Sequence, residues 1–172
     1  MPADRLPIRP AIPTDAAAMA SVVTEGLNGY KAFAPPGWTP PGDVMNPDVL
    51  RDRIDDGDTW IAVAPLGDGD LAGLVGATSA RRSRPGSDPP AELAHLWLCF
   101  VREAYHGTGL APRLLQWAVD GARERGFTRM RLFAAAGQKR ARRFYEREGW
   151  TPGEPFEDVG FGMALVEFRR EL

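Results

Sequence analysis

The sequence predicts an α+β fold in which helices flank a mixed, mostly antiparallel sheet. Two observations lead to this prediction. Strands in the middle of the chain are joined by a short hairpin turn, and the later strands alternate with helices, which requires a parallel crossover. The chain has 172 residues, of which 44% are hydrophobic and 26% charged, as in one globular domain. No break in composition divides it, so we expect a single domain over residues 1–172.

The expected elements follow from apolar periodicity and from the positions of turn-forming residues. In chain order they are an edge strand at 6–12, helices at 14–29 and 46–57, strands at 59–64, 71–78 and 91–101, a helix at 109–125, a strand at 128–135, a helix at 138–148 and a strand at 163–168.

Prolines and helix caps mark the first half of the chain. Pro7 and Pro10 limit the first segment to an edge strand, because proline removes an N–H from the strand ladder. Thr14 is expected to cap the first helix, and Asn46 followed by Pro47 to begin the second. Both helices are short, and a proline-rich loop separates them.

Glycines divide the second half. The sequence Gly-Asp-Gly-Asp at 67–70 predicts the hairpin turn between two apolar strands. Glycines at 107 and 109 open a helix in which Leu110, Leu114 and Trp117 share a face. Gly126 ends this helix, and the apolar run after it predicts a buried strand.

Charge and composition exclude several classes of protein. The formal net charge of -2 gives no reason to expect a nucleic-acid partner. Cys99 is the single cysteine, so no intrachain disulfide forms and a reducing compartment fits. With two histidines, His95 and His106, the chain lacks ligands for a Cys/His zinc site. The sequence shows neither a signal peptide nor a membrane span, so we expect a cytoplasmic protein.

The turn at 106–111 (His-Gly-Thr-Gly-Leu-Ala) is the most informative segment. A strand ends, glycines make a tight turn and a helix begins, which leaves unpaired N–H groups suited to a phosphate. A nucleotide-binding P-loop requires Lys-Ser/Thr after the second glycine, where Leu110-Ala111 stands. A dinucleotide fold requires a third glycine where Pro112 stands. A plain structural turn stays open as an alternative.

The same turn resembles the acyl-CoA-binding motif of the GNAT superfamily of N-acetyltransferases. That motif runs Arg/Gln-x-x-Gly-x-Gly/Ala, with a valine five residues earlier. Gly109 and Ala111 occupy its last two fixed places, Val101 occupies the valine position, and His106 stands where Arg or Gln is usual. A separate segment, 138–150, resembles the family pattern Asn-x-x-Ala-x-x-Leu/Phe-Tyr-x-x-x-Gly-Phe, with Gln138 in place of Asn.

The resemblance implies the GNAT (acyl-CoA N-acyltransferase) fold and acetyl-CoA as co-substrate. It places the cofactor on the backbone amides of the glycine turn and on neighbouring side chains. The residues expected to contact it are Cys99, Val101, His106, Gly107, Thr108, Gly109, Leu110, Ala111, Arg113, Gln138 and Arg142.

Acyl transfer to an amine needs a base, an oxyanion donor and an acid for the departing thiolate. Tyr145 matches the usual acid of the family, and the backbone N–H of Cys99 matches its oxyanion donor. By strand alternation His95, Trp97, Cys99 and Val101 would share one face. His95 is the first candidate base; Glu92 and ordered water are the alternatives.

In the family the acceptor site is formed by the first two helices and the loop before the last strand, here about 26–47 and 152–162. Tyr30, Phe33, Trp38 and Trp97 are the candidate substrate contacts. We expect N-acetyl transfer to a small-molecule amine in a ternary complex. A non-catalytic acyl-CoA sensor and a protein N-terminal acetyltransferase are the alternatives, and dimerisation of the chain stays open.

Overall fold

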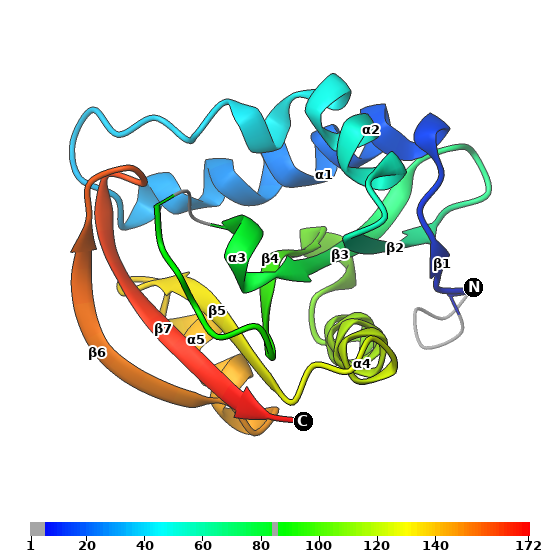
Figure 1. Ribbon diagram of the computed structural model, residues 1–172. Helices are drawn as coiled ribbons and strands as arrows, with labels where there is room; N and C mark the ends of the chain where they lie inside the picture. Colours follow the sequence, from blue (N-terminus) through cyan, green and yellow to red (C-terminus); the bar gives the residue numbers. More distant parts are fainter. Residues whose placement is uncertain (1–5, 84–85) are drawn as a thin grey trace.

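The computed structural model describes residues 6–83 and 86–172. Within that part of the chain, strands form one seven-stranded sheet in the order β1-β2-β3-β4-β5-β7-β6 (Figure 1). Only β4 and β5 run parallel among the described pairs, as the crossover between them requires. The strands are β1 Arg9–Pro10, β2 Thr59–Pro65, β3 Leu71–Ser79, β4 Leu93–Val101, β5 Arg129–Ala135, β6 Thr151–Asp158 and β7 Met163–Glu171. The predicted α+β class and mixed, mostly antiparallel sheet are confirmed.

Helices cover both faces of the sheet (Figure 1). Helices α1 (Ala16–Asn28) and α2 (Pro47–Asp55) bury their apolar sides on one face, through a core that includes Met19 and Leu50. Helices α4 (Leu110–Glu124) and α5 (Lys139–Arg147) pack on the other, in a larger core with Leu114. A short helix, α3 (Ala80–Ser83), follows β3. No helix among residues 6–83 and 86–172 is long and apolar enough to cross a membrane.

Strands β4 and β5 pair over only part of their length. Their register runs from Leu93 opposite Arg129 to Leu96 opposite Leu132 and then stops. Beyond that point β4 and β5 are no longer paired, so the two strands diverge and the sheet opens into a fork. The fork provides a passage from one face of the sheet to the other.

A β-bulge in β4 overturns the predicted face of its residues. Leu96 pairs with Ala77 and Leu98 pairs with Gly76, so Trp97 is an extra residue opposite β3. The insertion reverses the alternation, because one added residue moves every later side chain to the opposite face. His95 and Cys99 therefore lie on opposite faces, and the prediction that they share one was wrong.

Three details of the expected elements were also wrong. Segment 152–162, expected to be a loop, contains most of β6, an exposed edge strand whose prolines and polar residues hid the pattern. Thr14 does not cap α1; the N-cap is Asp15, whose carboxylate accepts from the N–H of Ile12 at 2.8 Å. The first strand shrinks to two residues. The cap at Asn46 was correct, since its side chain accepts from the N–H of Asp48 at 2.9 Å.

Candidate functional site

A cavity of about 840 Å³ runs through the fork between β4 and β5. Its walls come from the end of β4, the turn before α4, one side of α5, and the last turn of α1. The residues that line it include Glu25, Tyr30, Cys99, Val101, His106, Gly107, Gly109, Ala111, Phe133, Gln138, Arg140 and Tyr145. The two segments that resemble family motifs are therefore opposite walls of one space.

The glycine turn presents main-chain N–H groups at the edge of this cavity. Gly107 and Gly109 have φ angles of 76° and 83°, the left-handed region in which glycine alone is unstrained. Gly109 is the N-cap of α4 and supplies no capping side chain. In the described part of the chain, the N–H groups of residues 107–111 make no hydrogen bond. Thr108 steadies the turn, because its hydroxyl donates to the carbonyl of Tyr105 at 2.6 Å.

An anion is the natural partner of such a turn. The unpaired N–H groups and the dipole of α4 both favour negative charge there. Pro112, in the first helical turn, removes an N–H that the helix could not have used. The unpaired N–H groups from Gly107 to Ala111 are those that a phosphate cradle requires, and binding of a phosphate there stays a prediction.

His106 and Arg140 meet across the mouth of the cavity. Nε2 of His106 lies 2.8 Å from the carbonyl oxygen of Val101, and Nδ1 lies 2.6 Å from Nη1 of Arg140. Arginine is a donor only, so Nδ1 accepts and Nε2 carries the proton that it donates to Val101. This contact could not be predicted from the sequence, because Arg140 stands in a run of basic residues on α5, a composition typical of a solvent-facing surface.

Tyr145, Cys99 and Tyr30 converge at the deep end. Burial, together with the neighbouring Cys99 and Tyr30, raises the pKa of the Tyr145 phenol well above its ordinary value. Burial raises the pKa of the Cys99 thiol to about 12, against a hydrogen bond from Tyr145 that lowers it. Burial likewise raises the pKa of Tyr30 to about 12. All three groups therefore carry their protons at neutral pH.

Two arginines expected at the cofactor lie elsewhere. Nη2 of Arg113 donates to the carbonyl of Leu6 at 2.9 Å, and Nη1 of Arg142 donates to the carbonyl of Ala136 at 3.0 Å. Neither side chain lines the cavity. Gln138, by contrast, lies in the cavity wall as the N-cap of α5, and its side chain makes no capping bond.

Neither candidate base lines the cavity. His95 is buried, with 7% of its surface exposed, and its ring lies 5.3 Å from that of Phe133, which does line the cavity. Glu92 is exposed at the start of β4 and pairs with Arg129 at 2.6 Å. Its own main-chain N–H and Arg129 lower the pKa of its carboxyl, which makes it a weaker base.

The expected substrate aromatics fall into two groups. Tyr30, Phe33 and Trp38 pack together, with ring centroids 5.1 Å and 5.9 Å from Tyr30, and of these only Tyr30 lines the cavity. The indole N–H of Trp38 donates to the carbonyl of Phe161 at 2.7 Å, which joins the 30–46 loop to the β6–β7 turn. Trp97 lies apart from them, under the guanidinium of Arg53.

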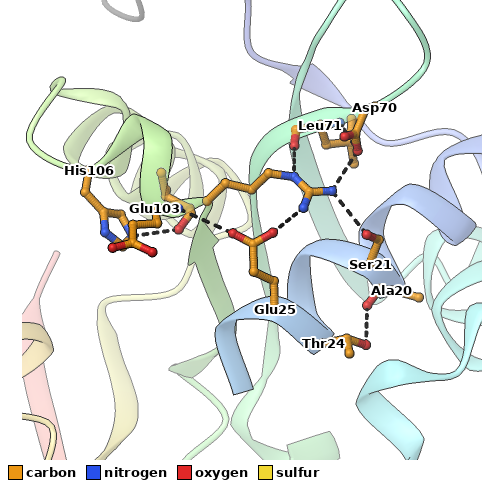
Figure 2. Close-up of polar contacts among 10 residues, drawn as sticks. Ala20, Ser21, Thr24, Glu25, Asp70, Leu71, Glu103 and His106 are labelled. Carbon is orange, nitrogen blue, oxygen red and sulfur yellow. Dashed lines mark hydrogen bonds and ion pairs between the residues drawn. The ribbon is translucent and has the colours of Figure 1, made fainter. Parts of the chain in front are cut away.

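Arg102 fixes α1 against the end of β4. Its guanidinium contacts the carboxylate of Glu25, the carboxylate of Asp70 at 2.8 Å and the hydroxyl of Ser21 at 3.1 Å. Nε donates to the carbonyl of Leu71 at 2.9 Å. Figure 2 shows these groups converging from α1 and the start of β3. Glu25 also lines the cavity, so the network positions part of its wall.

Comparisons with known proteins agree with this geometry. The model of the Acetyltransferase (GNAT) family matches residues 28–150. The fold is similar to that of the PaiA N-acetyltransferase of Thermoplasma acidophilum in complex with coenzyme A, with a TM-score of 0.74, 15% identity, and coverage of 96% of this chain and 98% of that one.

A ribosomal-protein-alanine N-acetyltransferase of Brucella melitensis gives a TM-score of 0.71 at 20% identity, covering 97% of this chain and 100% of that one. The GNAT domain of S. lividans PAT gives 0.69 at 24% identity, with 96% and 89% covered. These similarities show a shared fold. Comparison with curated proteins gives no match.

Proposed function

The chain belongs to the acetyltransferase (GNAT) family, and we propose that it transfers an acetyl group from acetyl-CoA to the amine of a small molecule. The observation that carries the proposal is the row of unpaired N–H groups at 107–111, on the wall of a cavity that ends at Tyr145. The fold relative that holds coenzyme A supports acetyl-CoA as the co-substrate.

The residues present suit that co-substrate. The amides of Gly107 to Ala111 would hold the diphosphate, since each bond to a charged oxygen contributes about 1.5–3 kcal/mol. Gln138, in the opposite wall, would contact the pantetheine arm. Cys99, beside Tyr145, would flank the thioester end, and Val101, nearer the mouth, would contact the part of the cofactor between the thioester and the diphosphate.

Tyr145 is the proposed acid. Its raised pKa keeps the phenol protonated, so that it can donate to the thiolate as that group departs. The raised pKa of the Cys99 thiol disfavours a thiolate nucleophile and therefore an acyl-cysteine intermediate. Both shifts support direct attack by the amine in a ternary complex. A main-chain N–H on the unpaired edge of β4, with Cys99 as the expected donor, would stabilise the oxyanion.

His95 is the proposed base for the amine. It faces away from Cys99, on the α1 side of the sheet, from which the acceptor would approach. His95 does not line the cavity but contacts Phe133, which does, so the proton would have to reach His95 through a hydrogen-bonded relay. Glu92 is the weaker candidate, since its carboxylate is exposed, ion-paired and outside the cavity.

A small acceptor fits the acceptor side better than an extended peptide. The bond from Trp38 to Phe161 joins the two segments between which a peptide would lie. A protein N-terminal acetyltransferase is kept as the second candidate, because one fold relative is a ribosomal-protein-alanine N-acetyltransferase. The bridge at Trp38 would have to open for that role.

The test combines binding with turnover. Calorimetric titration with CoA and acetyl-CoA measures binding, and release of free thiol is followed with panels of small amines and of N-terminal peptides. Turnover with small amines, reduced in Tyr145→Phe while CoA affinity is kept, is the expected result. Turnover on peptides alone would favour the second candidate, whereas binding without turnover on any amine would leave only a sensor.

A further inference from the structure

We infer that Arg140 binds the diphosphate of CoA, and that His106 positions it there. This rests on the proposed function, since it concerns the same cavity. It adds a side chain to a site otherwise composed of main-chain amides, and it places the charge on the helix opposite the glycine turn. His106, which stands where the family motif has Arg or Gln, acts on the ligand through Arg140.

The position of Arg140 follows from its contacts. It lies in the first turn of α5, and its side chain crosses to the loop before α4 to meet His106 at 2.6 Å. His106 directly precedes the N–H groups of residues 107–111, which have no partner in the described segments. The guanidinium thus lies beside the amides that would hold the diphosphate. Both residues line the cavity.

The donors of Arg140 are largely unused. A guanidinium has several N–H groups in a planar fork, which suits a phosphate group. Among the described residues its side chain makes one hydrogen bond, to His106, and no ion pair with a carboxylate. An arginine held in place with free donors and uncompensated charge is prepared for an anion.

His106 contributes position and no charge. Because Nδ1 accepts from Arg140 and Nε2 donates to Val101, the ring is neutral in this arrangement. The positive charge next to the turn therefore comes from Arg140. Glutamine could replace both contacts of the ring, since its side chain carries an acceptor and a donor.

Other arginines serve as comparisons. Arg142 uses its guanidinium on the carbonyl of Ala136 and lies outside the cavity wall. Arg143, about one turn along α5 from Arg140, is exposed and lies outside the cavity wall. It therefore offers a control of equal charge on the same helix.

The experiment measures the affinity of Arg140→Ala for CoA, dephospho-CoA and pantetheine by calorimetry, with Arg143→Ala as the matched control. We expect Arg140→Ala to lose about tenfold for CoA and for dephospho-CoA, which share the diphosphate, and nothing for pantetheine, which lacks it. Arg143→Ala should stay within about twofold of wild type. The salt dependence of CoA binding should be shallower in Arg140→Ala.

The role of His106 is tested by a double-mutant cycle. His106→Ala should weaken CoA binding less than Arg140→Ala, have no effect in the Arg140→Ala background, and be rescued by His106→Gln. Circular dichroism and the thermal midpoint verify that each variant is folded. If wild type binds CoA and Arg140→Ala binds it equally well, or loses affinity for CoA but not for dephospho-CoA, the inference is overturned. Failure of wild type to bind CoA at all would instead refute the proposed function.

Discussion

The two sides of the cavity use different kinds of chemistry. On the cofactor side, the turn at 106–111 and helix α4 present main-chain N–H groups whose positions glycine dihedrals set. On the proposed acceptor side, Tyr30 and Trp38 meet Phe161, more than 100 residues further along the chain, through ring contacts. The first is a local structure; the second exists only when the whole chain is folded.

This difference explains which part tolerates change. A backbone site depends on φ angles and on the absence of side chains, so few substitutions are neutral there. A site composed of side chains can change its residues and, with them, its ligand, while the fold stays the same. The cofactor side is therefore expected to give the larger loss on mutation, and the acceptor side to set specificity.

The strongest test of the comparison is Gly109→Asp. A carboxylate at the N-cap of α4 would occupy the N–H groups itself and repel a phosphate, so we expect CoA affinity to fall more than about 100-fold. Calorimetry with CoA measures the loss. Gly109→Asn is the matched control, since it has the same size and tolerates positive φ, yet carries no charge.

Asparagine at this position should cost about tenfold at most, so that the difference between the two variants isolates the charge. Equal CoA affinity in Gly109→Asp and wild type would contradict an anion at the turn. The thermal midpoints of both variants must lie close together for the comparison to hold.

Tyr145→Phe tests the deep end, where both sides meet. Loss of the acid should lower kcat by about 100- to 1,000-fold and leave CoA affinity within about threefold. The pKa of Tyr145 is raised, so its phenol keeps its proton at any pH below that value. The loss of wild-type activity that results from deprotonation of Tyr145 should therefore begin only above about pH 10. Tyr30→Phe is the control, with a smaller loss. A wild-type alkaline limb near pH 8 that vanishes in Tyr145→Phe would contradict the shift.

The local elements of the cofactor side could be predicted from the sequence, and the roles of their residues stay predictions. Glycine spacing, the strand before it and the helix after it are all local, so the cradle at 107–111 and the place of Tyr145 could be inferred. Side chains that depend on contacts between distant segments could not. The contact of Arg140 with His106 is one of these, and Arg113 and Arg142, expected at the cofactor, bond instead to the carbonyls of Leu6 and Ala136.

The bulge at Trp97 is the clearest limit of sequence reasoning. Alternation assumes a regular strand, and one extra residue in β4 separates the faces of His95 and Cys99. No residue type in the segment marks the insertion, because glycine and proline are absent from it. The β6 edge was missed for the opposite reason, since its prolines and glycine indicate a loop.

His95→Gln tests which side provides the base. If His95 accepts the proton of the amine, kcat at neutral pH should fall about tenfold or more, and the acid limb of the rate profile should change, while CoA binding is kept. Glu92→Gln is the control and should stay near wild type, because its carboxylate is exposed and outside the cavity. The reverse order of effects would assign the base to Glu92, and no effect in either variant would favour water.

The smallest expected effect concerns Arg102, which joins the two sides by linking α1 to the start of β3. Its partners Glu25 and Asp70 have side chains that are 44% and 45% exposed, so solvent screens both ion pairs. Arg102→Ala should therefore lower the free energy of unfolding by about 1–2 kcal/mol, measured by urea denaturation. The exposed ion pair of Arg51 and Asp48 is the control. Arg51→Ala should change the free energy of unfolding by about 0.5 kcal/mol or less.

The dependence on pH sharpens this last test. The N–H of Leu71 and the guanidinium of Arg102 hold the pKa of Asp70 below its usual value of 3.8. Because the pKa of Asp70 is lower in the folded state, its carboxylate contributes fully to the free energy of unfolding above about pH 4. This contribution is lost as the pH falls through the pKa of Asp70 in the folded protein. The stability difference between wild type and Asp70→Asn should therefore be constant near neutrality and disappear in acid. Glu25, a partner of Arg102, also borders the cavity. A loss of turnover in Arg102→Ala at unchanged CoA affinity would therefore show that the position of α1 affects the acceptor side and not the cofactor side.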